Sequence, residues 1–89
     1  MENFYFTFGF GTDKANCYTV IKANTWEEAR NKMVERWGLN WAFQYSEDEW
    51  VLNPNNCSNF EEQCKWHGIN PYATTPVTQA VMYGLREIK

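Results

Sequence analysis

The chain begins with a segment in which large aromatic rings alternate with smaller or polar side chains. Aromatic rings occupy every second position from Phe4 to Phe10. A period of two is typical of a strand with one buried face. A polar segment, GTDKAN, follows, and the β-branched segment CYTVIKA then predicts a returning strand, so residues 3–23 are expected to form a β-hairpin. In the second strand, one face is expected to carry Cys17, Thr19 and Ile21, and the other Tyr18, Val20 and Lys22.

The hydrophobic period then changes from two to about 3.6. Thr25 is followed three residues later by Glu28, the spacing of a capping box, in which each residue satisfies an unpaired N–H group at the start of a helix. Gly38 can adopt the left-handed conformation that ends a helix. The sequence therefore predicts a helix over 25–37 that packs on the sheet. Its apolar positions are Trp26, Ala29, Met33, Val34 and Trp37.

A third strand is predicted over 40–46, where the segment NWAFQYS is short, aromatic and roughly alternating. Ser46 and Glu49 have the spacing of a second capping box and predict a helical turn at about 47–52. The residues expected on one face of the strand are Trp41, Phe43 and Tyr45.

Short elements are predicted for the rest of the chain. A third capping box, Ser58 with Glu61, predicts a helix over 59–66, and Thr75-Pro76 resembles another helix start. The segment YGLREIK predicts a last strand that closes the sheet. The expected class is α+β: a small antiparallel sheet, made of the N-terminal hairpin and one or two further strands, packed on one main helix with short additional helices.

Composition limits the organisation of the chain. Its 89 residues, 44% hydrophobic and 18% aromatic, are enough for one core, so 1–89 is expected to be a single domain. No apolar run approaches the roughly 18 residues of a membrane span, and the N-terminus lacks the features of a secretory signal. A cytoplasmic location is expected. Three cysteines favour reduced thiols or metal ligation over a disulfide framework.

Two of the three cysteines and the single histidine fall within the segment CSNFEEQCKWH, residues 57–67. Zinc prefers thiolate and imidazole ligands, and three cysteines with one histidine are a common set in structural sites. Cys64 and His67 are three residues apart, which makes them neighbours on one helical face. The sequence therefore predicts a structural zinc site. Its expected ligands are Cys17, Cys57, Cys64 and His67.

Cys57 constrains the zinc hypothesis. In a continuous helix its Cα would lie about 10 Å from that of Cys64, whereas two thiolates on one zinc ion need Cα atoms within roughly 7 Å. The loop before Cys57 would have to curl back, and Cys17 would have to point from the hairpin toward that loop. The alternative is that Cys17 and Cys64 are small core residues and that His67 lies near a helix C-terminus.

Negative charge is concentrated in the middle of the chain. The formal net charge is −3, and no Lys or Arg occurs after Trp37 and before Cys64. One interpretation is a solvated surface that keeps the protein soluble. The other is a patch that faces a basic protein partner, because complementary charges steer association. The residues expected to bind this partner are Glu47, Asp48, Glu49, Glu61 and Glu62.

The residue spacings in the sequence give little indication of a catalytic site. Cys64 and His67 lie three residues apart on one predicted helix, where a nucleophile and a base seldom align, and no third orienting group is evident. The segment EDE at 47–49 lacks the alternating spacing and the glycine of a calcium loop. The sequence therefore predicts that the protein is not an enzyme.

Residues 4–50 carry a resemblance when they are taken together: the strand FYFTFGFG, the helical segment WEEARNKM, and WAFQY followed by SEDEW. This half of the chain resembles small phage and mobile-element proteins of Firmicutes. More narrowly, it is similar to type II-A anti-CRISPR proteins of streptococcal phages, some of which contain a metal. The resemblance implies an inhibitor that binds a Cas9-type effector nuclease and blocks its DNA loading. The shared region does not include Cys57, Cys64 or His67, so no metal ligand is carried over.

Two function hypotheses follow. The first is a monomeric phage-type inhibitor in the host bacterial cell that binds a basic surface of a Cas9-type effector through its acidic residues, with a structural zinc ion and without direct nucleic-acid binding. The alternative is a zinc-stabilised nucleic-acid-binding or regulatory module of a mobile element. The net charge of −3 counts against the alternative, because nonspecific nucleic-acid affinity comes mainly from Lys and Arg.

Overall fold

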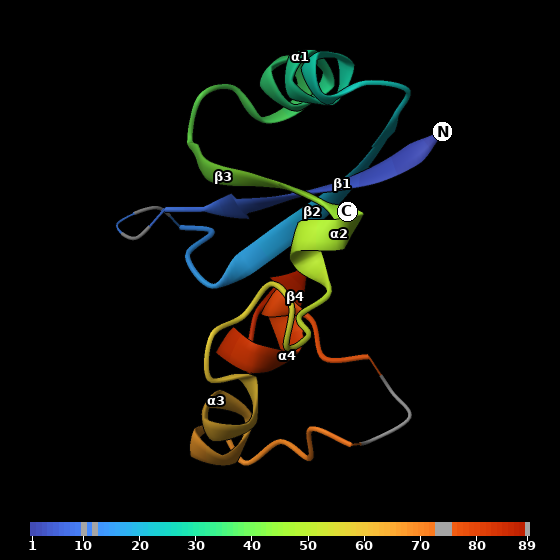
Figure 1. Cartoon of the computed structure of the whole chain (residues 1–89). Helices are drawn as coiled ribbons and strands as arrows, with labels where there is room; N and C mark the ends of the chain where they lie inside the picture. Colours follow the sequence, from blue (N-terminus) through green and yellow to red (C-terminus); the bar gives the residue numbers. More distant parts are fainter. Residues whose placement is uncertain (10, 12, 73–75, 89) are drawn as a thin grey trace.

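The computed structural model describes residues 1–9, 11, 13–72 and 76–88. Within these residues the chain forms a four-stranded sheet in the order β3-β1-β2-β4, with the main helix α1 on one face and three short helices on the other (Figure 1). The predicted α+β class is confirmed. The elements are β1 (Glu2–Phe8), β2 (Cys17–Ala23), α1 (Trp26–Trp37), β3 (Trp41–Ser46), α2 (Glu47–Trp50), α3 (Phe60–Trp66), α4 (Gln79–Tyr83) and β4 (Arg86–Glu87).

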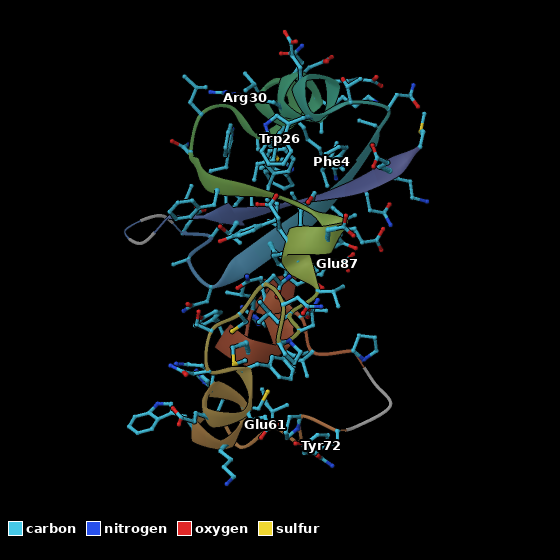
Figure 2. All side chains as sticks on the ribbon, viewed as in Figure 1. Phe4, Trp26, Arg30, Glu61, Tyr72 and Glu87 are labelled. Atoms are coloured by element: carbon cyan, nitrogen blue, oxygen red, sulfur yellow. The ribbon has the colours of Figure 1, made fainter. Side chains whose placement is uncertain are left out.

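The alternation in β1 places Phe4, Phe6 and Phe8 on the face that α1 covers, and all three are buried. Each of these rings meets a tryptophan edge to face, the geometry that aromatic quadrupoles favour. Figure 2 shows the first of these pairs between the sheet and α1. The pairs are Phe4 with Trp26 (5.8 Å between ring centroids), Phe6 with Trp41 (5.2 Å) and Phe8 with Trp37 (5.7 Å).

Helix α1 begins and ends where its signals predict, although its capping box is only half formed, because Glu28 Oε2 accepts from the Asn24 N–H and not from the Thr25 N–H. The Thr25 hydroxyl accepts a hydrogen bond from the Glu28 N–H at 3.1 Å, and Gly38 ends the helix at a φ of 72°. Ala29 and Met33 are fully buried against the sheet. Strands β2 and β3 both pair antiparallel with β1, so they run parallel to each other and α1 connects them across β1.

Strand β3 contains a bulge that changes which face its first residue occupies. Thr7 pairs with Phe43, but the next residue, Phe8, pairs with Trp41, so Ala42 is an extra residue on β3. A bulge of this kind reverses the alternation beyond it. Trp41 therefore packs against the core on the α1 side, and its expected placement beside Phe43 and Tyr45 is wrong.

We call residues 47–72 and 76–85 the distal lobe, which covers the sheet face opposite α1 (Figure 1). It has a small apolar core of its own. Leu52, Cys57 and Ile69 pack against this core, and an antiparallel bridge joins Val51 to Thr78. The core residues are Phe60, Cys64, Val77 and Met82.

Two helix starts in the distal lobe differ from the expected ones. The capping box of Ser58 and Glu61 is absent, because Asn59 takes the N-cap position of α3 at a φ of 58° and its side chain caps no N–H. Asn tolerates this left-handed conformation better than most residues. Helix α4 begins only at Gln79, after an N-cap at Thr78.

A backbone hydrogen bond explains why α4 begins later than predicted. The Leu52 N–H donates to the Val77 carbonyl at 2.7 Å, which keeps the chain extended at this point. Pro76 therefore lies outside the helix, and Thr75 lies outside the described residues. The predicted last strand is β4, which pairs parallel with β2, so the sheet is mixed and the expectation of an antiparallel sheet is wrong for this strand. None of the described helices has the length and apolar character to cross a membrane.

Trp50 joins the distal lobe to the sheet. The capping box at the end of β3 forms as predicted: the Ser46 N–H donates to Glu49 Oε1 at 3.1 Å, and Ser46 Oγ accepts from the Glu49 N–H at 3.4 Å. The short helix α2 then turns the Trp50 indole onto the sheet, where it is only 3% exposed. Its ring is stacked on Tyr5 at 4.6 Å with an interplanar angle of 4°. Tyr18 and Tyr45 also contact it, at 4.9 and 5.5 Å between centroids.

Replacing Trp50 should therefore destabilise the whole protein. We expect Trp50→Ala to lower the free energy of unfolding by about 3–5 kcal/mol, because a large buried ring leaves a cavity. Trp50→Phe keeps a ring and should lose less. Urea unfolding followed by circular dichroism measures both changes.

The matched control is Trp66→Ala on α3, where the indole is 85% exposed. Its free energy of unfolding should stay within about 0.5 kcal/mol of the parent value. Equal effects of the two alanine variants would contradict the assigned role of Trp50.

Candidate functional site

The four expected zinc ligands are not brought together. Cys17 is buried in the core between the sheet and α1, whereas Cys64 is buried in the distal core and Cys57 packs against that core. The sheet separates Cys17 from the other two thiols. His67 is exposed after α3, and its ring meets Tyr83 edge to face at 5.6 Å. In the described part of the chain, no three His, Cys, Asp or Glu side chains are grouped to hold a metal.

The environment of Cys64 also disfavours a catalytic role. Burial raises the pKa of its thiol, and the nearby Cys57 and Glu61 raise it further. Nucleophilic attack needs the thiolate, which a raised pKa makes scarce at neutral pH. The separation of Cys17 from Cys57 and Cys64 means that the four residues are not placed to share a zinc ion in this structure. Cys17 and Cys64 occupy the positions expected of small core residues, the alternative that the sequence left open.

The five expected partner-binding residues are all exposed, in two groups. Glu47, Asp48 and Glu49 lie in α2, and Glu61 and Glu62 lie in the first turn of α3. Two of the carboxylates already have partners, since Glu49 accepts from Ser46, and Glu61 accepts from the Tyr72 hydroxyl (Figure 2). For the other three, the described residues show no side-chain hydrogen bond or ion pair. These three are Glu47, Asp48 and Glu62.

The balance of acidic and basic residues differs between residues 1–46 and residues 47–85. Residues 1–46 contain five acidic and five basic residues, whereas residues 47–85 contain five acidic residues and one basic residue, Lys65. The two ion pairs found among the described residues, Asp13 with Lys14 and Glu28 with Lys32, both lie in the N-terminal part. The distal lobe therefore presents carboxylates with little internal neutralisation.

Two of the exposed aromatic residues of the distal lobe lie close to these acids in the chain or are bonded to one of them. Trp66 is 85% exposed and lies one turn of α3 after Glu62, while Tyr72 is 76% exposed and bonded to Glu61. Sequence reasoning assigned the aromatics to the core and missed both. The helical period could have identified Trp66, because it follows the buried Cys64 by two residues, a rotation of about 200° that places it on the other side of the helix.

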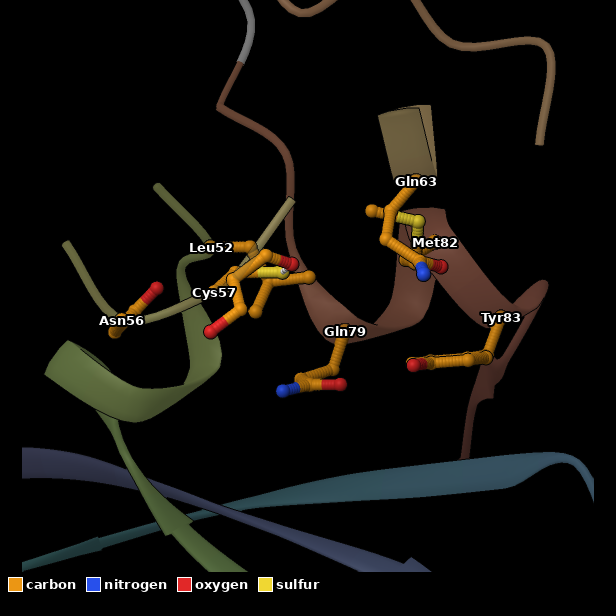
Figure 3. A pocket seen from close by; sticks show the side chains of 8 residues that line it. Leu52, Asn56, Cys57, Gln63, Gln79, Met82 and Tyr83 are labelled. Atoms are coloured by element: carbon orange, nitrogen blue, oxygen red, sulfur yellow. Dashed lines mark hydrogen bonds between the residues drawn. The ribbon is translucent and has the colours of Figure 1, made fainter. Parts of the chain in front are cut away.

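A cleft of about 340 Å³ lies between α3, α4 and the loop before α3 (Figure 3). The described residues of its lining mix amides with apolar side chains and include the Cys57 thiol. No carboxylate, lysine, arginine or histidine is found among these described lining residues. The residues shown in Figure 3 include Leu52, Asn56, Cys57, Gln63, Gln79, Met82 and Tyr83.

A second cleft, of about 710 Å³, lies beside Trp50 over β1 and β2. The phenols of Tyr5 and Tyr18 line it together with Glu47 and Glu87. Burial is the main reason that the pKa of each phenol is raised. The negative charge of Glu47 raises the pKa of Tyr5 further, and that of Glu87 raises the pKa of Tyr18 further. The Tyr18 hydroxyl also donates to Glu87 Oε1 at 3.5 Å. Both rings therefore remain neutral at neutral pH.

Comparison with known proteins adds no family: no family model, curated protein or solved structure matches the chain significantly.

The raised pKa values predict that the protein loses stability in alkali. An acid whose pKa is higher in the folded state keeps its proton longer than in the unfolded chain, so ionisation favours unfolding. The free energy of unfolding should fall from about pH 8.5, where the unfolded Cys64 ionises, and further above about pH 10, where the unfolded tyrosines ionise. Urea unfolding at a series of pH values measures this.

The matched variant is Tyr5→Phe, which removes one of the titrating hydroxyls and keeps the ring. It should lose less stability between pH 9 and pH 11 than the parent protein. A stability that stays constant or rises over this range would contradict the assignment.

Proposed function

We propose that this chain is an inhibitory protein-binding module whose distal lobe covers a basic surface of a Cas9-type effector nuclease and so blocks DNA loading. The observation that carries the proposal is the combination of unneutralised carboxylates with exposed aromatic rings on one lobe. Glu62 and Trp66 are one helical turn apart, and Tyr72 is bonded to Glu61. Trp and Tyr are enriched among the residues that contribute most to protein–protein binding.

The charge of the distal lobe suits a partner that normally binds nucleic acid. A surface that binds DNA uses Lys and Arg to neutralise phosphates. Carboxylates on a folded protein can pair with the same cations and exclude the DNA. Complementary charge also accelerates association and disfavours partners of the wrong sign. The resemblance of residues 4–50 to type II-A anti-CRISPR proteins supports an effector nuclease as the partner.

The competing nucleic-acid-binding hypothesis has less support. Both hypotheses included a zinc ion on Cys17, Cys57, Cys64 and His67, and the two cores hold Cys17 apart from Cys57 and Cys64, so zinc favours neither. The nucleic-acid hypothesis needs cations on the binding surface, whereas residues 47–85 contain only one. The proposal assigns no catalytic step to the chain.

The acidic surface can be tested by reversing the three carboxylates that lack a side-chain partner. The variant carries Glu47→Lys, Asp48→Lys and Glu62→Lys. We expect its affinity for a purified guide-loaded Cas9-type effector to fall at least about tenfold, since like charges then face each other. Isothermal titration calorimetry measures the affinity, and a DNA-loading assay measures the inhibition.

The matched control reverses three exposed acids outside the distal lobe, through Glu2→Lys, Glu27→Lys and Glu35→Lys. Both variants change the net charge equally, and each places lysine in the first turn of a helix. The control should keep most of the affinity, and thermal melting should show that both variants fold. An equal loss in the two variants, or no loss in either, would contradict the proposal.

A further inference from the structure

The sheet face opposite α1 retains an open aromatic cleft of about 560 Å³. It lies where the hairpin end of β1 and β3 faces α4. Phe43 and Tyr45 line it from β3, Tyr83 and Gln79 line it from α4, and Leu85 follows that helix. We call this site the aromatic cleft. Its volume is within the range of sites that bind small ligands or single side chains of a partner.

The rings of the aromatic cleft are unusually accessible. Phe43 is 63% exposed and Tyr83 is 59% exposed. Phe43 and Tyr45 are tilted by 45° at 6.4 Å between centroids, so neither ring covers the face of the other. Trp50 contacts Tyr45 at 5.5 Å and forms a fixed wall behind it. The cleft therefore offers ring faces on a rigid support.

The electrostatics of the aromatic cleft favour a cation. Among the residues that the structure describes, those that line it carry no charged side chain. The Glu49 carboxylate is close enough to Tyr45 to raise the pKa of its phenol, after burial and Tyr83. The Gln79 amide donates to the Glu49 backbone carbonyl at 3.5 Å and so joins α4 to α2. Neutral rings beside a negative charge attract cations through their π-faces.

We propose that the aromatic cleft receives an arginine side chain of the partner protein. A guanidinium group is planar, stacks on aromatic faces and is more weakly hydrated than an ammonium group, so it suits this cleft better than lysine. The phenol and amide oxygens can accept its N–H groups. The inference rests on the proposed function and deepens it, because it names the chemical group that a basic partner inserts beside the acidic surface.

The test uses a blocked Gly-Arg-Gly peptide and the same peptide with citrulline, which has the shape of arginine without its charge. Titration is followed by NMR of the ring resonances of Phe43, Tyr45 and Tyr83. We expect all three to shift with a dissociation constant in the millimolar range, and the citrulline peptide to bind at least about tenfold more weakly. Equal binding of the two peptides, or no ring shift up to about 20 mM arginine peptide, would overturn the proposal.

Variants identify the rings that carry the binding. Phe43→Ala and Tyr83→Ala should each weaken arginine-peptide binding several-fold, and Tyr83→Phe should retain most of it because the ring remains. Val81→Ala is the matched control, since Val81 is 49% exposed on the same helix but does not line the cleft. Thermal melting checks that each variant folds. Unchanged peptide binding by both ring-removing variants would overturn the assignment.

The two proposals can fail separately. A Phe43→Ala variant that binds the effector as tightly as the parent would overturn the arginine inference, and the acidic surface would remain supported if its charge-reversed variant bound weakly. Conversely, selective binding of the arginine peptide would support the cleft even if charge reversal of the distal lobe left effector binding unchanged.

Discussion

The stacking of Trp50 on Tyr5 is the interaction on which the rest of this structure depends. Helix α1 covers one face of the sheet, and on the other face the Trp50 ring contacts Tyr5, Tyr18 and Tyr45. The distal lobe has only a small core of its own, in which four buried residues are assisted by three partly buried ones. A core of that size stabilises little by itself. The indole therefore joins two small cores into one folded unit.

The same interaction determines where function can lie. Trp50 lies on the sheet face between two clefts. The cleft of about 710 Å³ lies over β1 and β2, and the aromatic cleft lies near β3. It also holds α2, so the carboxylates of Glu47 and Asp48 are displayed from a helix whose other side is anchored. A rigid display reduces the entropy lost on binding. The proposed inhibitor function and the proposed arginine cleft both depend on this anchoring.

Local signals in the sequence predicted most of the fold, whereas long-range geometry determined the site. The hairpin, α1 and the turn after β3 follow from alternation and capping boxes, which involve residues close in the chain. The bulge opposite Thr7 and Phe8 depends on pairing between separate strands, and for that reason the placement of Trp41 was wrong. The cysteine count predicted a ligand set, but only the topology shows that the sheet divides Cys17 from Cys57 and Cys64.

A double-mutant cycle between Tyr5 and Trp50 tests the central claim most directly. The free energy of unfolding is measured for Tyr5→Leu, Trp50→Leu and the double variant, with Tyr5→Leu combined with Trp66→Leu as a reference pair. Stacked aromatic pairs contribute about 0.5–1.5 kcal/mol beyond their buried area. The account predicts a coupling energy of about this size for Tyr5 with Trp50 and additive effects for the reference pair. A coupling below about 0.3 kcal/mol for Tyr5 with Trp50 would contradict it.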